Sequence, residues 1–255
     1  NLAAFRWGRR AVCETEAVGA LVDAAHEPTP VRHLSQTLDE IIERRAQFLT
    51  GYQNKAYAAR YRQWVARVRA REAALGSSTT LTEAVARYLF KLMAYKDEYE
   101  VARLYTDGNF ARQLASTFSG DRIRLEFHLA PPILSPRDAH GHPRKMTFGP
   151  WMLPLFRVLA AFKGLRGTAL DPFGRTEERR MERQLIQDYE TLLAELIEKL
   201  DAGNHALAVG LASIPEKIRG FGHIKQRHLE AAKREETELL ERFRTGVPPL
   251  AVAAE

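Results

Sequence analysis

Residues 176–200 constrain the fold most, because they carry the clearest helical periodicity in the chain. Apolar side chains recur there at three- and four-residue intervals, so they share one face of an α-helix while charged residues cover the rest. Such a helix has to bury its apolar stripe against other elements. The segment therefore predicts a helix packed into a helical core through Met181, Leu185, Tyr189, Leu192, Leu196 and Leu200.

Similar periodicity predicts helices over most of the remaining chain. One long helix is expected to begin after a cap at Ser35 and to run to Gly76, with a kink at Gly51. Thr80 and Glu83 have the spacing of a capping box, which indicates that a new helix begins there. Further helices are expected at residues 110–118, 151–164, 205–214 and 216–244.

One short region has the period of a strand. Apolar and polar residues alternate through residues 122–130, as in a half-buried strand, and residues 144–148 are the expected partner. A two-stranded hairpin is marginal alone and has to pack on helices. The predicted fold class is therefore mainly α, a helical domain with one small β element at about residues 122–130 and 144–148.

Composition shifts divide the chain into three parts. Residues 1–28 are predicted to be a short helical tail and linker, because prolines follow at positions 28 and 30. Residues 35–245 form the predicted helical domain, and residues 246–255 a flexible tail. The first residues hold neither an initiating Met nor a signal-peptide core, so we expect the chain to be a piece of a longer protein.

The bulk composition excludes several classes of site. Cys13 is the one cysteine, so neither an internal disulfide nor a cysteine-held iron–sulfur cluster can form within the chain. No apolar run approaches the roughly 20 residues of a membrane span. The net charge of +6 is modest, and no nucleic-acid-binding motif accompanies the arginines. We therefore expect a cytoplasmic protein that binds neither nucleic acid nor membranes.

The segment from Met93 to Tyr105 mixes tyrosines with charges in an unusual way. Read as one continuous helix, it allows an ion pair between Lys96 and Glu100 and a cation–π contact between Tyr99 and Arg103. Tyr95, Lys96, Tyr99 and Arg103 are accordingly candidate interface residues. The alternative is a helix at the edge of the core, with tyrosines whose hydroxyls reach solvent.

A second candidate site is the cationic, glycine-rich segment from residue 219 to residue 225. Glycines let the backbone approach a ligand, and Arg, His and Lys suit a phosphate or carboxylate. The candidate ligand-binding residues are Arg219, Gly220, Gly222, His223 and Lys225. The alternative is a helix break in which the two glycines permit close packing.

Other constellations give no site. His128, Asp138, His140 and His142 lie close in sequence, but their spacing matches no closed zinc motif and a polar hairpin loop explains them. No Ser/His/Asp or Cys/His catalytic set is present. We predict neither a catalytic residue nor a metal site.

Several motifs in order resemble the C-terminal domain of the fused, single-chain indolepyruvate ferredoxin oxidoreductases. The resemblance covers about residues 35–245, and residues 1–25 look like the end of the preceding gamma-type domain. The motifs are Leu49-Thr-Gly-Tyr-Gln53, Tyr57-Ala-Ala-Arg-Tyr-Arg62, Tyr88 to Tyr105, Phe127-His-Leu-Ala-Pro-Pro132, Phe148-Gly-Pro-Trp151, Lys163-Gly-Leu-Arg-Gly-Thr168, Asp171-Pro-Phe-Gly174 and Ile218 to Lys225.

The resemblance implies a thiamine-diphosphate-dependent oxidation of an aryl pyruvate to an acyl-CoA, with electrons passed through iron–sulfur clusters to ferredoxin. Its cofactors would be thiamine diphosphate, Mg²⁺ and the clusters, with CoA as a substrate. None is expected in this chain: the cysteines are missing, and Thr106-Asp-Gly-Asn109 lacks the leading glycine of the diphosphate motif. The resemblance thus implies an accessory domain that contacts the N-terminal domains of the same polypeptide.

Two roles stay open for such a domain. In the first, it helps bind CoA or the substrate carboxylate through the segment at residues 219–225. In the second, it is purely structural and joins the subunits of a homo-oligomer without contacting a ligand.

Overall fold

The computed structural model describes residues 2–25, 37–76, 78–118, 123–130, 135 and 144–246. The chain divides into two compact units, Asn1–Thr37 and Leu38–Glu255. The first unit holds helices α1 (Leu2–Cys13) and α2 (Thr15–Ala25), which contact each other. The predicted linker at residues 26–30 and the tail at residues 247–255 lie outside the described residues.

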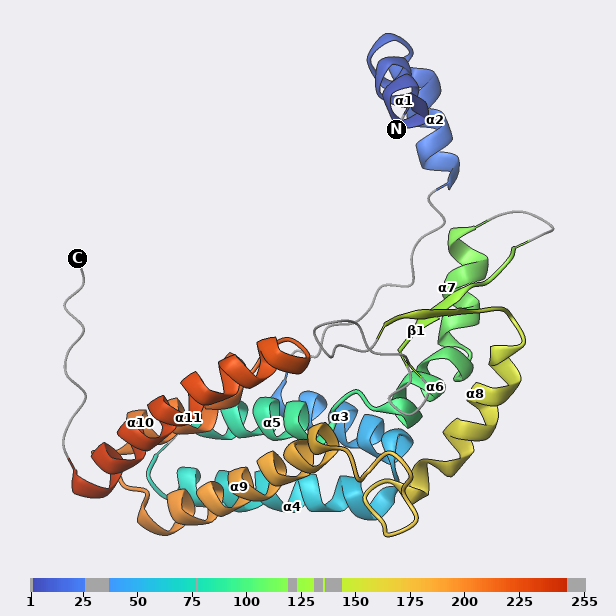
Figure 1. The fold of residues 1–255 in the computed structure, drawn as a ribbon. Helices are drawn as coiled ribbons and strands as arrows, with labels where there is room; N and C mark the ends of the chain where they lie inside the picture. The colour runs from blue at the N-terminus through green and yellow to red at the C-terminus, as the bar shows by residue number, and fades with distance from the viewer. Residues whose placement is uncertain are drawn as a thin grey trace. The chain divides into compact units, whose positions relative to one another are not determined.

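Six helices of the second unit form a bundle around the larger apolar core (Figure 1). They are α3 (Leu38–Tyr52), α4 (Lys55–Ala73), α5 (Thr80–Met93), α9 (Glu177–Lys199), α10 (His205–Ser213) and α11 (Gly222–Thr245). The stripe predicted in residues 176–200 is buried in this core, except that Met181 is half-buried against it. The prediction of a packed amphipathic helix is confirmed.

The predicted long helix of residues 35–76 is two helices, not one helix kinked at Gly51. The backbone of Asn54 is extended, and its side-chain Oδ1 accepts a hydrogen bond of 2.9 Å from the backbone N–H of Tyr57. This is the geometry of an N-cap. The cap begins α4 in a new direction, and α3 and α4 pack side by side.

The predicted continuous helix through residues 93–105 is wrong for the same reason. Helix α5 ends at Met93, and α6 (Glu98–Thr106) begins after an N-cap at Asp97. Oδ1 of Asp97 accepts a hydrogen bond of 2.8 Å from the backbone N–H of Glu100. The break carries α6 away from the bundle (Figure 1).

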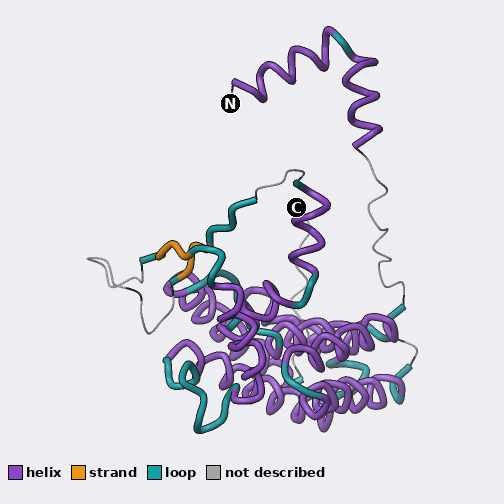
Figure 2. The backbone as a smooth tube through the Cα atoms, turned by 90° about the vertical axis from the view of Figure 1, so that its right-hand side faces the viewer, coloured by secondary structure: helices purple, strands orange, loops and turns teal. Residues whose placement is uncertain are grey.

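A smaller layer packs around α6 at one end of the bundle (Figures 1 and 2). It contains α7 (Asn109–Thr117), the antiparallel strands β1 (Phe127–Leu129) and β2 (Met146–Phe148), α8 (Met152–Ala161) and the 3-10 helix η1 (Phe162–Leu165). Its own small core is centred on Ala102, Phe127 and Phe156. The strands are shorter than predicted, because regular pairing covers only three residues on each.

The fold class is mainly α with a small β element, as predicted. A second 3-10 helix, η2 (Ile214–Lys217), joins α10 to the turn before α11. Within the described ranges, no helix combines the length and apolarity that crossing a membrane requires.

Candidate functional site

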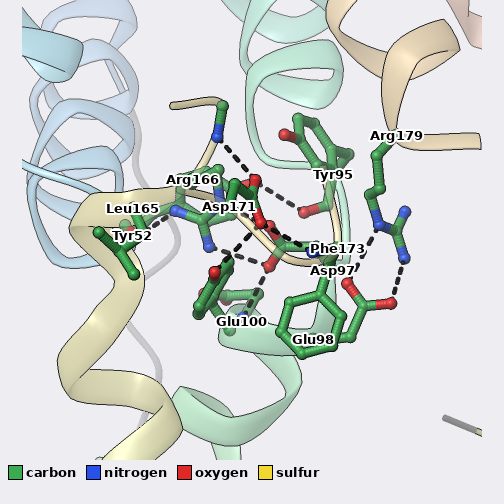
Figure 3. A network of polar contacts seen from close by, with 12 residues as sticks. Tyr52, Tyr95, Asp97, Glu98, Glu100, Leu165, Arg166, Asp171, Phe173 and Arg179 are labelled. Atoms are coloured by element: carbon green, nitrogen blue, oxygen red, sulfur yellow. Dashed lines mark hydrogen bonds and ion pairs between the residues drawn. The ribbon is translucent and has the colours of Figure 1, made fainter. Parts of the chain in front are cut away.

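A buried ion pair lies where the bundle meets the smaller layer (Figure 3). Asp97, in the turn between α5 and α6, faces Arg166, which follows η1. Nε of Arg166 donates to Oδ2 of Asp97 at 2.5 Å and Nη2 donates to Oδ1 at 2.9 Å. Each side chain is only 3% exposed. Bidentate geometry and low exposure make this contact strong and orientation-specific.

Tyr52, at the end of α3, completes the surroundings of Arg166. Its carbonyl oxygen accepts a hydrogen bond of 2.7 Å from Nη1 of Arg166, and the guanidinium carbon lies 3.6 Å from the centre of its ring. The Tyr52 hydroxyl donates to the carbonyl oxygen of Tyr95 at 2.9 Å. Burial raises the pKa of Tyr52 far above its ordinary value. Arg166 therefore ties the end of α3 to the α5–α6 turn.

Asp171 holds the loop after η1 in place. Its Oδ2 accepts a hydrogen bond of 2.8 Å from the backbone N–H of Gly167, and its Oδ1 accepts from the hydroxyl of Tyr99 and the N–H of Phe173, both at 3.1 Å. Gly174 must approach this carboxylate closely, since a Cβ there would lie 2.6 Å from Oδ2. The Asp-Pro-Phe-Gly motif is therefore a turn in which the final glycine packs against the side chain of the first residue, Asp171.

The hydrogen-bonding groups of Asp97 and Arg166 are engaged in contacts within the chain. Both oxygens of Asp97 accept hydrogen bonds, and all three nitrogens of Arg166 donate. A proton-transfer residue needs an accessible atom beside a substrate. This network positions backbone segments, and we assign it no catalytic step.

A second ion pair links α6 to the bundle. Nη2 and Nε of Arg179, in the first turn of α9, each lie 3.2 Å from a carboxylate oxygen of Glu98. The guanidinium of Arg179 also lies 5.9 Å from the ring centre of Tyr95. The pair (Figure 3) is partly buried and contributes to the lining of a cavity beside α6.

That cavity, of about 520 Å³, opens between α6, α8 and the hairpin. Its lining is mainly apolar and includes Val101, Leu129, Phe148, Trp151, Leu155 and Phe156. The outer face of α8 continues this surface, because Trp151, Leu155, Val158 and Phe162 are each 50–59% exposed. Their spacing places them on one side of the helix. The stripe that the sequence shows at residues 151–162 is thus amphipathic, but much of it faces outward.

The predicted interface residues fall into two groups. Tyr95 and Tyr99 are buried in the chain's own structure, which contradicts the prediction that they form a surface contact. Lys96 is exposed and lines the apolar cavity. Arg103 pairs with Glu100 at 2.8 Å and lies over the ring of Phe48.

Neither predicted contact of this segment forms as expected. Glu100 pairs with Arg103 and not with Lys96, and the guanidinium that lies over Tyr99 belongs to Arg166. The turn at residues 94–97 changes the direction of the chain after Tyr95. The four-residue spacing of a helix therefore does not apply to Lys96 and Glu100. Tyr99 and Arg103 both lie in α6, but the guanidinium of Arg103 pairs with Glu100 and lies over the ring of Phe48 instead.

The predicted ligand segment is the turn between η2 and α11. Gly220 and Gly222 have positive φ values of 91° and 55°, which glycine adopts without strain. Arg219 pairs with Glu216 at 3.2 Å, and the ammonium group of Lys225 pairs with Glu182. These contacts favour the alternative of a helix break, and binding of a ligand by these residues stays a prediction. His223 lies in the first turn of α11.

Lys91 is a residue that the sequence analysis missed. Its Nζ donates to three carbonyl oxygens at the end of η2, those of Pro215, Ile218 and Glu216, at 2.6, 3.0 and 3.2 Å. A cation at exposed carbonyls satisfies acceptors that a helix end leaves open. No local pattern indicates such a contact, because more than a hundred residues separate its partners.

A family model matches residues 38–238 and is described as a family of unknown function, DUF6537. The chain belongs to the DUF6537 family. No curated protein and no solved structure matches it. The matched range begins with α3 and includes the bundle, the smaller layer and most of α11.

The absence of the parent enzyme's cofactors from the DUF6537 region stays a prediction. The described residues of this region contain no group of three His, Cys, Asp or Glu side chains arranged to hold a metal ion. Asp107, in the segment compared with a diphosphate motif, accepts hydrogen bonds from Asn109 and pairs with Arg103 in the turn before α7. Of the four residues that the sequence analysis rejects as a metal site, residues 138, 140 and 142 lie outside the described residues.

Proposed function

We propose that this chain is a non-catalytic docking domain of a larger 2-oxoacid:ferredoxin oxidoreductase polypeptide. The observation that carries the proposal is the apolar surface formed by α8 and the cavity beside it. Monomeric proteins rarely expose a continuous apolar patch of several hundred Å², and such patches mark interaction sites. The occupant that we propose is a preceding domain of the same polypeptide.

The rigid joint beneath this surface supports a docking role. The Asp97–Arg166 pair and the Glu98–Arg179 pair connect α6 to the bundle, and α6 packs extensively against α8. A docking surface can orient a bound domain only if the surface is held rigidly to the rest of its own domain. The two ion pairs supply that fixation, since charge-assisted contacts are directional.

The chemistry of the parent reaction belongs, in this proposal, to the other domains. Thiamine diphosphate, Mg²⁺ and iron–sulfur clusters would be held there, and ferredoxin and CoA would be met there. The one cysteine of this chain is too few to ligate a cluster. A cytoplasmic location is part of the same proposal, because a single cysteine suits a reducing compartment.

The test introduces a charge into the proposed contact in the full-length polypeptide. Leu155→Asp and Val158→Asp place carboxylates on the exposed apolar side of α8. We expect either change to weaken docking at least tenfold, seen as faster proteolysis around this domain and slower oxoacid-dependent reduction of ferredoxin. Arg157→Asp, at an exposed position of the same helix, is the matched control.

Two results would contradict the proposal. Unchanged proteolysis and turnover in Leu155→Asp and Val158→Asp would show that the surface is not covered by a neighbouring domain. A light-scattering mass of the 255-residue chain that halves on either substitution would instead show that a second copy covers it. That outcome would support the purely structural, oligomeric role.

A further inference from the structure

A second cavity of about 210 Å³ lies on the bundle side of the joint, between α4, α9 and the backbone at Gly167. Three arginines contribute to its lining, Arg60, Arg166 and Arg183, and no acidic residue does. A cavity with only cationic side chains among its charged groups has a positive potential unless carboxylates outside the lining compensate those charges. The state of each arginine decides whether that potential is compensated.

Two of the three arginines form ion pairs with carboxylates that lie outside the cavity lining. Arg60 makes two hydrogen bonds of 2.6 Å with the carboxylate of Glu190, and Arg166 is held by Asp97. Arg183 differs, because it forms no ion pair with any carboxylate in the described part of the chain. Its Nη2 donates to the carbonyl oxygen of Gly174 at 2.6 Å.

The other amino group of Arg183 has no hydrogen-bond partner in the part of the chain that the structure describes. Its Nη1 is buried and donates to no acceptor among the described residues. A buried donor without an acceptor costs free energy, and in native proteins such a group calls for an unseen partner such as an ion or a water molecule. Arg183 therefore adds to the lining a charge that no carboxylate of the described residues neutralises, and one of its buried donors is unused.

The other lining groups suit an anion with an apolar part. Ile186 and Gln187 follow Arg183 at helical spacing on α9, so the three line the same wall. The lining also includes Tyr57 and Tyr95. Burial is the largest influence on Tyr95 and raises its pKa to about 12, from an ordinary value that already leaves the hydroxyl protonated and able to donate at neutral pH.

We propose that this cavity binds a small organic anion, with its carboxylate or phosphate group on Arg183 and its apolar part against Tyr57, Tyr95 and Ile186. The planar guanidinium fork suits either group, since carboxylates and phosphates both accept its N–H donors and both are attracted by its charge. The volume lies below the roughly 300–1,000 Å³ of sites for drug-sized ligands, which favours a small acid over a nucleotide. This site is separate from the docking surface on α8.

The test measures binding to the 255-residue chain by titration calorimetry at constant ionic strength. The probes are sodium benzoate, sodium pyruvate and sodium phosphate, with sodium chloride as the reference. We expect saturable binding of at least one probe, and a loss of at least tenfold in Arg183→Gln. Arg180→Gln removes an exposed arginine from the same helix and should leave affinity within twofold.

Two further variants keep the test decisive if Arg183→Gln folds poorly. Arg183→Lys retains the charge but not the fork, so it should bind more weakly than the wild type. Gln187→Trp fills the cavity from its exposed rim without changing charge and should abolish binding.

The choice among probes identifies the ligand class. Binding of benzoate or pyruvate but not phosphate assigns a carboxylic acid, and the reverse assigns a phosphate ester. Absence of saturable binding by all three probes, or equal affinity in the wild type and Arg183→Gln, would overturn the proposal. Because no other domain is present in the experiment, neither result bears on docking through α8.

Discussion

Asp97 and Arg166 form one contact that serves two elements at once. The carboxylate oxygen of Asp97 that accepts from Nη2 of Arg166 also accepts from the backbone N–H of Glu100. The same group therefore begins α6 and fixes it to the loop after η1. This coupling makes the direction of α6 depend on a residue 69 positions further along the chain.

Removing one partner of this pair should destabilise the protein strongly. Asp97→Ala leaves the guanidinium of Arg166 buried without its carboxylate, and breaking such a pair costs about 3–5 kcal/mol of unfolding free energy. Urea denaturation followed by circular dichroism measures the loss. The double variant Asp97→Ala/Arg166→Met should lose less than the two single variants summed, because no unpaired charge remains.

An exposed pair provides the comparison. Nη2 of Arg62 donates to both carboxylate oxygens of Glu43, and both of these side chains are exposed. Glu43→Gln should leave the denaturation midpoint nearly unchanged, because solvent screens such pairs. Equal losses in Glu43→Gln and Asp97→Ala would show that burial of the Asp97–Arg166 pair is not what makes it important.

The fold class follows from the sequence, but two helix boundaries do not. Asn54 and Asp97 are both residue types that cap helices, so the local signal is present in each case. The capping signal does not lead to a predicted break, because apolar residues continue at helical spacing on both sides of it, as they do between Leu49 and Tyr61. Periodicity predicts which residues are buried. It does not predict that one helix ends and another begins in a new direction between two buried segments.

The cap at Asn54 can be tested directly. Asn54→Ala removes the acceptor of the Tyr57 N–H and should lower the unfolding free energy by about 1 kcal/mol. Asn54→Asp keeps an acceptor at the same place and adds a charge that favours a helix N-terminus, so it should be neutral or stabilising. Thermal denaturation of the three proteins gives the ranking, and a stable Asn54→Ala variant would show that packing alone fixes the start of α4.

The buried polar groups were harder to predict than the helices. The turn at Asp171-Pro-Phe-Gly174 is recognisable from its residues, but the hydrogen bond from Tyr99 depends on a partner 72 positions away. In the sequence, Arg183 resembles the other charged residues of an amphipathic helix. Its contact with the carbonyl oxygen of Gly174, and the lack of an ion pair with any described carboxylate, become visible only in the structure. Tertiary contacts of this kind have no local sequence period. The exposed apolar side of α8 is equally hard to predict, because periodicity identifies an apolar helix face but does not show whether another part of the protein covers it.

Glu72 gives the protein a specific response to acid. Its carboxylate accepts hydrogen bonds from the backbone N–H groups of Leu81 and Thr82 and from the Thr82 hydroxyl, at 2.6–2.8 Å. Its second contact is with Nε2 of His205 at 2.8 Å. Glu72, and not a Thr80–Glu83 capping box, thus caps the start of α5.

The pKa of Glu72 sets the direction of the effect. Burial alone would raise this pKa, but hydrogen bonds from Thr82, His205 and the two amides outweigh burial and hold the pKa below its ordinary 4.5. A lowered folded-state pKa adds stability above about pH 4.5, and that stability is lost as the pH falls below this value. Acidification should therefore destabilise the wild type more than a variant without this carboxylate.

Glu72→Gln tests this linkage. At pH 7 the variant should lose about 1–3 kcal/mol of unfolding free energy, because a buried charged acceptor is gone. The difference from the wild type should shrink between pH 4.5 and pH 3, as measured by urea denaturation. Glu83→Gln, an exposed change in the first turn of the same helix, should show a much weaker pH dependence. A constant difference for Glu72→Gln at all pH values would contradict the assignment.

The smaller layer should respond separately from the bundle, because Phe156 belongs to its own core. Its ring is 3% exposed, stacks on Tyr105 at 5.2 Å and meets the edge of Phe127 at 5.3 Å. Phe156→Ala should cost about 3–5 kcal/mol locally. Hydrogen exchange should then accelerate in α6, α8 and the hairpin while amides of α4 and α9 keep their protection. Phe118→Ala, at a position 58% exposed, is the control, and equal acceleration throughout the bundle would show that the two cores unfold together.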